Sequence, residues 1–427
     1  MSGGATAEVS RDTARAEVTG ARRLLTGVAV TVLPLLAGLY VGATTFGGTL
    51  LPWRPVMVDL EVYRQAGGAL LAGQDVYDLP GQLPFLYPPL AALLAVPLSL
   101  LPATLVQVAW TAAGVLALLA VIHRFGLTGW RLSLVGAGAV VVVEPVSQTL
   151  AFGQLGIFLV ALVVLDLVPG PRVLSGRRRL LPEGALTALA AAIKLTPAIF
   201  VLYLLAVRRW RPAVAAVITG ALVTLAAAAV VPGPSLTFWG RLARGDTGLG
   251  HSLIYYTNQS VMADVVRVVG LGSGAAALGL LLSALVAGLG VWAGAAWHRR
   301  GDVGLAVVVV GMAGLLASPV SWLHHFVWIV PLGLVLLDRL RPVTTAGGRT
   351  QPLPAWFQAW GWVIVGWVIV APFRRLPNGA DLELTWTWDQ HLLASVTAVL
   401  GVGWLLAALV VARRPAPGGP AVHRLPA

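Results

Sequence analysis

The stretch "LLTGVAVTVLPLLAGLYVGATTF", residues 24–46, decides the fold of this 427-residue chain. It carries no charge and exceeds the roughly 20 residues that a helix needs to cross a bilayer. It is also longer than the apolar segment of a cleaved signal peptide, which has about 7–15 residues. Arg11, Arg15, Arg22 and Arg23 precede it. We therefore expect an uncleaved first span behind a disordered cytoplasmic arm, residues 1–23.

Similar apolar runs fill the rest of the chain, which is 58% hydrophobic and 11% charged. This composition predicts an all-α polytopic membrane protein. Because there is no cysteine, disulfides and thiolate chemistry are excluded. The further runs lie at about 85–101, 103–123, 131–147, 153–169, 181–207, 212–231, 272–297, 303–318, 322–341, 356–373 and 391–413.

The net charge of +12 does not indicate a nucleic-acid partner. The arginines cluster in short loops between apolar runs, where membrane proteins carry positive charge on the cytoplasmic side. A simple count of crossings places two of these loops, "HRFGLTGWR" and "RVLSGRRRL", on the wrong side. The partners expected on composition are therefore membrane lipids.

Two changes correct this topology. The proline-punctuated stretch "YPPLAALLAVPLSLLP" is read as a half-inserted or surface helix, and residues 181–207 as two short helices broken at "IKLTP". About twelve crossings then leave both termini and every arginine-rich loop inside. We expect one transmembrane domain, residues 24–413, with outer loops 47–102 and 232–271, outer-face helices and a cytoplasmic tail, 414–427. The alanine- and arginine-rich composition favours a bacterial plasma membrane.

This topology gathers ionisable and amide side chains at the outer face, which marks a candidate active site facing outside. In "VDLEVYRQAGG", Asp59 and Tyr63 share one face of a short helix. Asp59 is either a general base or a solvated acid of an amphipathic loop helix. Glu61 is the neighbouring acid.

Lys194 in "IKLTP" and the adjacent His324 and His325 in "SPVSWLHH" offer cationic and hydrogen-bond donors that could hold a lipid phosphate. The alternative is a lysine that snorkels to the interface, together with histidines of an interfacial belt. Neighbouring positions of a helix point apart, so we expect only one of the histidines to line a site. No spacing of histidines and carboxylates indicates a metal.

The loop "YYTNQS" combines Tyr256 with Asn258 and Gln259. These residue types suit the binding of sugar rings and hydroxyls, and they are equally typical of an interfacial belt. Gln154 and Glu144 occupy a helix-to-helix turn, "EPVSQTLAFGQ", where Glu144 could serve only as a local cap.

The ordered motifs "DLEVY", "GQDVY", "PFLYPPL", "FGQLG", "IKLTP", "YYTNQS" and "SPVSWLHH" resemble glycosyltransferase family 87, the polyprenol-phosphate-mannose-dependent α-mannosyltransferases of the GT-C superfamily. The resemblance covers about residues 24–341 and is fairly specific in its order. It implies a GT-C fold, a polyprenyl-phosphate-sugar donor, and a glycolipid or glycan acceptor, with no cofactor.

Carried onto this sequence, the resemblance makes Asp59 the base, with Lys194 and His324 on the donor phosphate and His325 in reserve. Candidate substrate contacts are Glu61, Tyr63, Gln154, Tyr256, Asn258 and Gln259. One carboxylate suffices for inverting transfer, because a phosphate whose charge is held by cations leaves without an acid. The alternative is a transporter or flippase for a lipid-linked sugar, which would carry charges toward the middle of the membrane.

Overall fold

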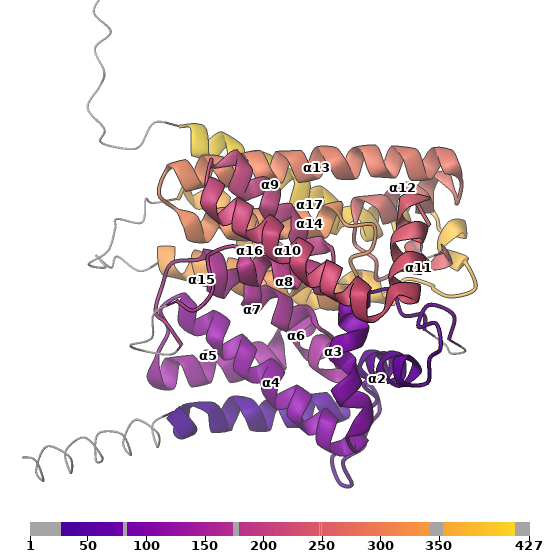
Figure 1. The fold of residues 1–427 in the computed structure, drawn as a ribbon. Coiled ribbons are helices and arrows are strands. Elements are labelled where there is room, and N and C mark those ends of the chain that lie inside the picture. The colour runs from indigo at the N-terminus through magenta and orange to yellow at the C-terminus, as the bar shows by residue number, and fades with distance from the viewer. Residues whose placement is uncertain are drawn as a thin grey trace, which may run out of the picture.

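The computed structural model describes residues 27–79, 83–173, 179–246, 248, 250–340 and 353–414, and within them it is helical without a β-strand. The predicted arm, residues 1–23, and nearly all of the predicted tail lie outside the described residues. Figure 1 shows the helices running side by side as one bundle. The expectation of an all-α fold is confirmed.

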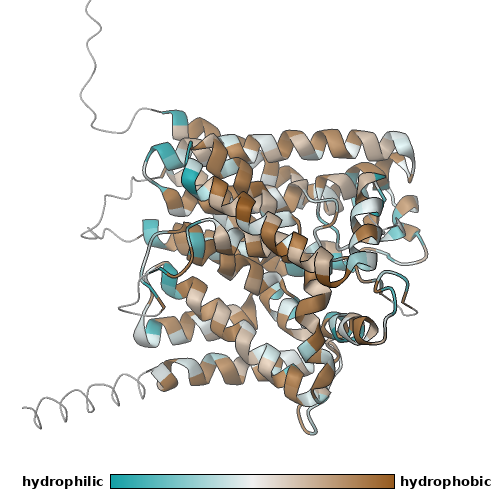
Figure 2. Ribbon diagram, viewed as in Figure 1, coloured by the Kyte–Doolittle hydropathy of each residue, from teal (hydrophilic) through white to brown (hydrophobic). Residues whose placement is uncertain are grey.

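Six described helices are long and apolar enough to cross a membrane, and a seventh span arises if the bent pair α5–α6 counts as one. Figure 2 shows hydrophobic residues along the middle of the bundle and hydrophilic ones gathered at its ends, as expected for a polytopic membrane protein. The predicted count of about twelve crossings stays a prediction. The six are Gly27–Thr44, α4 (Ala103–Arg124), α10 (Trp210–Val230), α13 (Ser273–Arg299), α16 with η4 (Ala355–Arg375) and α17 (Trp388–Arg413).

The shorter helices complete the bundle or cover one of its ends. Those within it are α5 (Gly129–Val142), α7 (Gly156–Leu167), α8 (Ala185–Ile193), α9 (Ile199–Ala206), α14 (Val303–Ala317) and α15 (Ile329–Arg339). The others are α2 (Val58–Leu71), α3 (Pro89–Leu100), α6 (Glu144–Phe152), α11 (Pro232–Ala243) and α12 (Val261–Val269). The 3₁₀ turns are η1 (Thr196–Ala198), η2 (Gly250–Leu253), η3 (Leu323–Trp328), η4 (Pro372–Arg375) and η5 (Leu382–Thr385).

The proline-punctuated stretch forms α3, which at 12 residues is about 18 Å long and falls short of a span. It packs along α2 at one end of the bundle (Figure 1). The contact is close because Gly67 has no side chain: a Cβ built there would lie 2.5 Å from the carbonyl oxygen of Ala95. We call the two helices the α2–α3 platform.

The apolar run at 181–207 is broken at Lys194, as predicted. α8 ends at Ile193, Lys194 is extended, and α9 begins after the turn η1. The far ends of the two helices are joined by a bidentate ion pair, in which Arg209 donates to Glu183 at 2.5 and 2.7 Å. The chain therefore enters and leaves at the same end of the bundle, and Lys194 lies at the tip of a hairpin.

Small residues let the long helices approach closely, as is usual where membrane helices pack. At the α13–α14 contact, a Cβ on Gly290 would lie 2.0 Å from the Cβ of Ala313, and one on Gly294 would lie 2.5 Å from Val310. The connections from α4 to α5, α9 to α10 and α13 to α14 lie at one end of the bundle (Figure 1), and arginines flank each of them in the sequence. α2, α3, α11 and α12 lie at the other end (Figure 1).

Candidate active site

A cavity of about 890 Å³ opens at the end of the bundle that carries α2 and α3. Its volume suits a sugar and part of a lipid headgroup. Its wall comes from segments far apart in the sequence: α2, α6, the Lys194 break, α11, η2, η3 and the segment that joins α16 to α17. Polar lining residues include Asp59, Tyr77, Tyr87, Gln148, Lys194, Arg241, His251, Tyr255, Tyr256, Trp322, His324, His325, Arg374, Asp381 and Glu383.

Asp59 lies in the first turn of α2 and lines the cavity, whereas the next residue, Leu60, is buried behind it. Burial raises the pKa of Asp59 to about 6, although the Gln154 side chain and the charge of Lys194 each pull it down. A carboxyl group with this pKa is ionised at neutral pH and can still accept a proton from a substrate. It has the properties of a general base.

Gln154 is held in place by two tyrosine hydroxyls. The hydroxyl oxygens of Tyr63 and Tyr87 lie 3.0 and 3.3 Å from Gln154 Oε1, and 3.0 Å from each other. Gln154 and Tyr63 are buried and lie outside the lining, so they position Asp59 from behind. This position supports the site from behind, and the role of Gln154 and Tyr63 as substrate contacts stays a prediction.

Lys194 brings a positive charge into the cavity. Its Nζ lies 2.9 Å from Nε2 of His325 and 5.4 Å from the ring centre of Tyr87. An ammonium group has no lone pair, so His325 Nε2 accepts this hydrogen bond and the imidazole is neutral. His325 thus orients the ammonium group, which remains able to donate to an anion.

Both histidines line the cavity, so the expectation that only one would do so is wrong. The reason is local: η3 is a tight 3₁₀ turn interrupted at Phe326, and both imidazoles pack near Trp322, with ring centres 4.5 Å apart. His324 Nε2 has no hydrogen-bond partner among the described residues, whereas His325 is engaged with Lys194. Of the two histidines, His324 is therefore the one whose Nε2 is uncommitted among these residues.

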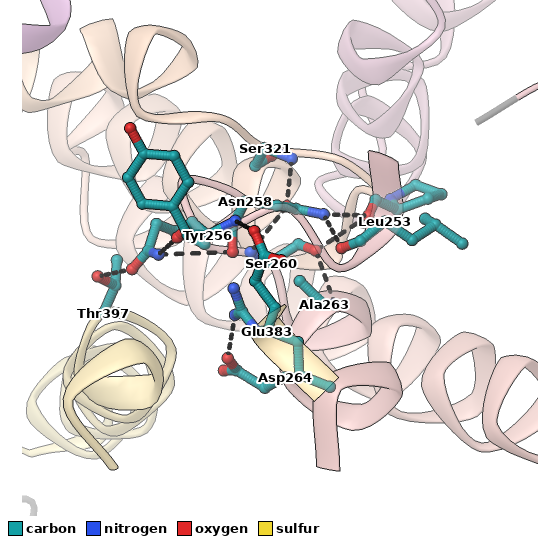
Figure 3. Close-up of polar contacts among 12 residues, drawn as sticks. Leu253, Tyr256, Asn258, Ser260, Ala263, Asp264, Ser321, Glu383 and Thr397 are labelled. Carbon is teal, nitrogen blue, oxygen red and sulfur yellow. Dashed lines mark hydrogen bonds and ion pairs between the residues drawn. The ribbon is translucent and has the colours of Figure 1, made fainter. Parts of the chain in front are cut away.

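Tyr255, Tyr256 and Thr257 of the "YYTNQS" loop line the cavity, whereas Asn258 and Gln259 do not. Figure 3 shows Asn258 bridging two segments: its Nδ2 donates to Leu253 and Pro319, and its Oδ1 accepts from Ser321 N–H at 2.9 Å. Gln259 accepts from the Thr397 hydroxyl at 2.5 Å. The structure thus gives these two amides a structural role, and they fix the loop that presents Tyr256.

Glu61 does not reach the cavity. It is exposed on α2 and pairs with Arg64 at 3.1 Å. Residues 59 and 61 are two positions apart on a helix, so their side chains point to different sides. Of the two acids that the sequence offered as the base, only Asp59 therefore lines the cavity.

Several lining residues are not among those that the sequence motifs indicated. Tyr87 contacts Lys194 and Gln154, although it appeared only within the quoted motif "PFLYPPL". Arg374 pairs with Glu144 across the cavity wall, so Glu144 is more than a local cap. Arg241, Arg374 and Glu383 come from α11 and the segment before α17, where no motif pointed to them.

Among the described residues, no group of three or more histidines and carboxylates is placed to hold a metal ion. Basic side chains that line the cavity are Lys194, Arg241 and Arg374. A helical membrane protein with a carboxylate and a lysine on one cavity at the end of its bundle has the layout of a group-transfer enzyme that acts on lipid-borne substrates.

Comparison with known proteins identifies the family of this enzyme. The chain belongs to glycosyltransferase family 87, whose model matches residues 85–319. The chain is 32% identical to the polyprenol-phosphate-mannose-dependent alpha-(1-2)-phosphatidylinositol mannoside mannosyltransferase of Mycobacterium tuberculosis (strain ATCC 25618 / H37Rv), over 89% of this chain and 90% of the relative. The protein of the same name from Mycolicibacterium smegmatis (strain ATCC 700084 / mc(2)155) is also 32% identical, over 87% and 86%.

A related enzyme, the polyprenol-phosphate-mannose-dependent alpha-(1-2)-phosphatidylinositol pentamannoside mannosyltransferase of Mycobacterium tuberculosis (strain CDC 1551 / Oshkosh), is 30% identical over 87% of this chain and 86% of its own length. No solved structure matches the chain. The predicted family is confirmed, and the protein is a multi-pass membrane glycosyltransferase. Nothing in the comparisons favours the transporter alternative.

Proposed function

We propose that the protein transfers mannose from polyprenyl-phosphate mannose to a hydroxyl of a phosphatidylinositol mannoside, with inversion at the anomeric carbon. The support for donor and acceptor is the shared naming of relatives that align along 86% or more of their length. The support for the chemistry is one juxtaposition: Asp59 and Lys194 line the same cavity, and Lys194 lies close enough for its charge to lower the pKa of Asp59.

In the reaction, Asp59 accepts the proton of the acceptor hydroxyl while the oxygen attacks the anomeric carbon of the donor sugar. The bond from that carbon to the phosphate oxygen breaks, and polyprenyl phosphate leaves with the electron pair. Lys194 and the free Nε2 of His324 hold the charge that develops on the phosphate. Direct displacement from the opposite face inverts the anomeric centre, so no covalent enzyme intermediate is needed.

The positions of the loops support an acceptor site on the outer side of the membrane. Arginine-rich loops favour the cytoplasmic side, and the cavity is at the opposite end of the bundle, so it faces outside. The natural chain has no cysteine, which allows a clean labelling test. In intact cells, a membrane-impermeant maleimide should label Leu51→Cys at the cavity end and spare Leu180→Cys, both of which replace highly exposed side chains. The reverse pattern would contradict the outward orientation.

The activity is tested with purified protein in proteoliposomes that contain polyprenyl-phosphate [¹⁴C]mannose and phosphatidylinositol mannoside. Labelled glycolipid with one added mannose is the expected product. Movement of unreacted labelled donor between leaflets, without product, would contradict the proposal and revive the transporter alternative.

A further inference from the structure

Glu383 is a second carboxyl group on the cavity wall. It lies in η5, is 2% exposed, and comes from the segment that joins α16 to α17. Its Oε1 accepts from the backbone N–H groups of Tyr256 and Gly379, both at 3.3 Å. Among the described residues, its Oε2 has no hydrogen bond and no basic side chain forms an ion pair with it.

A nearly buried carboxylate is unfavourable unless its oxygens receive hydrogen bonds. Two long contacts to one oxygen leave most of its acceptor capacity unused, because an ionised carboxylate can accept about four. Figure 3 shows the side chain of Glu383 directed toward the loop that carries Tyr256 and Asn258. A ligand in the cavity that donates hydrogen bonds to Glu383 would use the remaining acceptor capacity of its carboxylate.

The neighbouring side chains indicate which ligand this is. The rings of Tyr255 and Tyr256 both line the cavity and lie edge to face, with centres 4.8 Å apart. Flat aromatic surfaces pack against the C–H faces of sugar rings, and a carboxylate accepts from sugar hydroxyls. The loop is rigid, since Asn258 fixes it to Ser321 and Pro319. We call Tyr255, Tyr256 and Glu383 the sugar wall.

The sugar wall suits a neutral glycan and not the donor phosphate, which Glu383 would repel. Among the described residues, no hydrogen bond or ion pair joins Lys194, the cation assigned to the donor phosphate, to the sugar wall. Lys194 and His325 also border a second hollow of about 50 Å³, which shares no residue with the sugar wall. The pair Lys194–His325 and the sugar wall are therefore different parts of one cavity.

We propose that Glu383 binds the acceptor: its Oε2 accepts hydrogen bonds from hydroxyls of the acceptor mannose, which packs against Tyr255 and Tyr256. This inference rests on the proposed function, because it assumes that the acceptor is a glycan. It gives the segment between α16 and α17 a role in choosing which sugar presents the attacking hydroxyl.

The test is the steady-state kinetics of Glu383→Gln with polyprenyl-phosphate mannose and phosphatidylinositol mannoside, each varied in turn. The glutamine keeps an oxygen for the two backbone N–H groups, so the loop is retained, but it loses the charge that strengthens hydrogen bonds from hydroxyls. We expect the KM for the acceptor to rise at least about tenfold, with the KM for the donor changed less than twofold. The matched control is Asp389→Asn, an exposed carboxylate six positions further on that does not line the cavity.

Each outcome separates the two proposals. If the wild-type protein transfers mannose and Glu383→Gln leaves the acceptor KM unchanged, Glu383 only anchors backbone and the inference is overturned. A rise in the donor KM alone would place the donor sugar on the sugar wall and also overturn it. If the wild-type protein transfers nothing, the proposed function fails and the inference falls with it.

Discussion

Lys194 donates a hydrogen bond to His325 across 131 positions of sequence, with 2.9 Å between Nζ and Nε2. This contact ties the tip of the α8–α9 hairpin to the 3₁₀ turn η3. His325 orients the lysine, so that the ammonium group faces the cavity that Asp59 also lines. The two charges that the proposed transfer uses are thus placed by segments that are distant in sequence.

Replacing Lys194 by methionine keeps the length of the side chain and removes its charge. We expect kcat/KM for the donor to fall by about 10² or more, because a preorganised cation facing a developing negative charge contributes at least that much. Lys194→Arg should restore little, since a planar guanidinium cannot reproduce the single contact to His325. Transfer kinetics with varied donor measure both.

The control for this loss of one positive charge is Arg131→Met, at the arginine-rich end and outside the cavity. It should transfer mannose at the wild-type rate. Unchanged donor kinetics in Lys194→Met would contradict the assignment of Lys194 to the phosphate.

The pH dependence of transfer should follow Asp59. Burial raises the pKa of Asp59 to about 6, and only the ionised carboxylate can accept a proton. Single-turnover transfer should therefore increase as the pH rises and reach half of its plateau near pH 6. A profile that stays flat between about pH 5 and 8 would mean that another group is the base.

The same shift predicts a stability effect of opposite sign. A carboxyl group whose pKa is higher in the folded protein than in the unfolded chain, where it is about 3.9, stabilises the fold below that value and loses this contribution as the pH rises through about 6. At pH 7.5 the wild-type protein carries an ionised, largely buried Asp59. Asp59→Asn should therefore raise the free energy of unfolding there by up to about 3 kcal/mol, which thermal unfolding in detergent can detect.

The stability gain should disappear near pH 4, where the wild-type carboxyl group is itself protonated. Equal melting temperatures for the two proteins at pH 7.5 would show that Asp59 is not buried as described.

The α2–α3 platform offers a matched pair of glycines. A Cβ at Gly67 would press on the backbone of Ala95 at 2.5 Å, whereas one at Gly68 has only Ser99 near it, at 3.9 Å. Gly67→Ala should separate the helices, displace Asp59 and lower both thermal stability and transfer. Gly68→Ala should be neutral or should stabilise by about 0.5–1 kcal/mol, since alanine favours a helix. Equal behaviour of the two variants would contradict the close α2–α3 contact.

Much of the fold could be predicted because membrane helices carry strong signals. The run at 24–46, the break at Lys194 and the short α3 all follow from length, charge and proline. The number of crossings did not follow as firmly, because several helices are shorter than a span and bend at the cavity, as α5 and α6 do by 77°. Such bends depend on packing between distant segments.

The site was predicted in part for a similar reason. Lys194 and His324 are polar groups at breaks in apolar runs, and Asp59 lies in the first outer loop, so the sequence marked all three as candidates. Asn258 and Gln259 looked like sugar ligands, yet their amides are used to hold a loop, which only tertiary contacts show. Glu383 gave no signal, because an acid in a polar connecting segment usually faces water; its burial depends on the loop that packs over it.

The central claim is that Asp59 is the base of a mannosyl transfer that uses the charge of Lys194. The most direct measurement is single-turnover transfer from polyprenyl-phosphate [¹⁴C]mannose to phosphatidylinositol mannoside at pH 7.5, comparing wild type with Asp59→Asn while donor binding is measured in parallel. We predict that the variant binds the donor as tightly as the wild type and transfers about 10²–10⁴ times more slowly. Transfer within a few-fold of the wild-type rate by a donor-saturated Asp59→Asn would contradict the account.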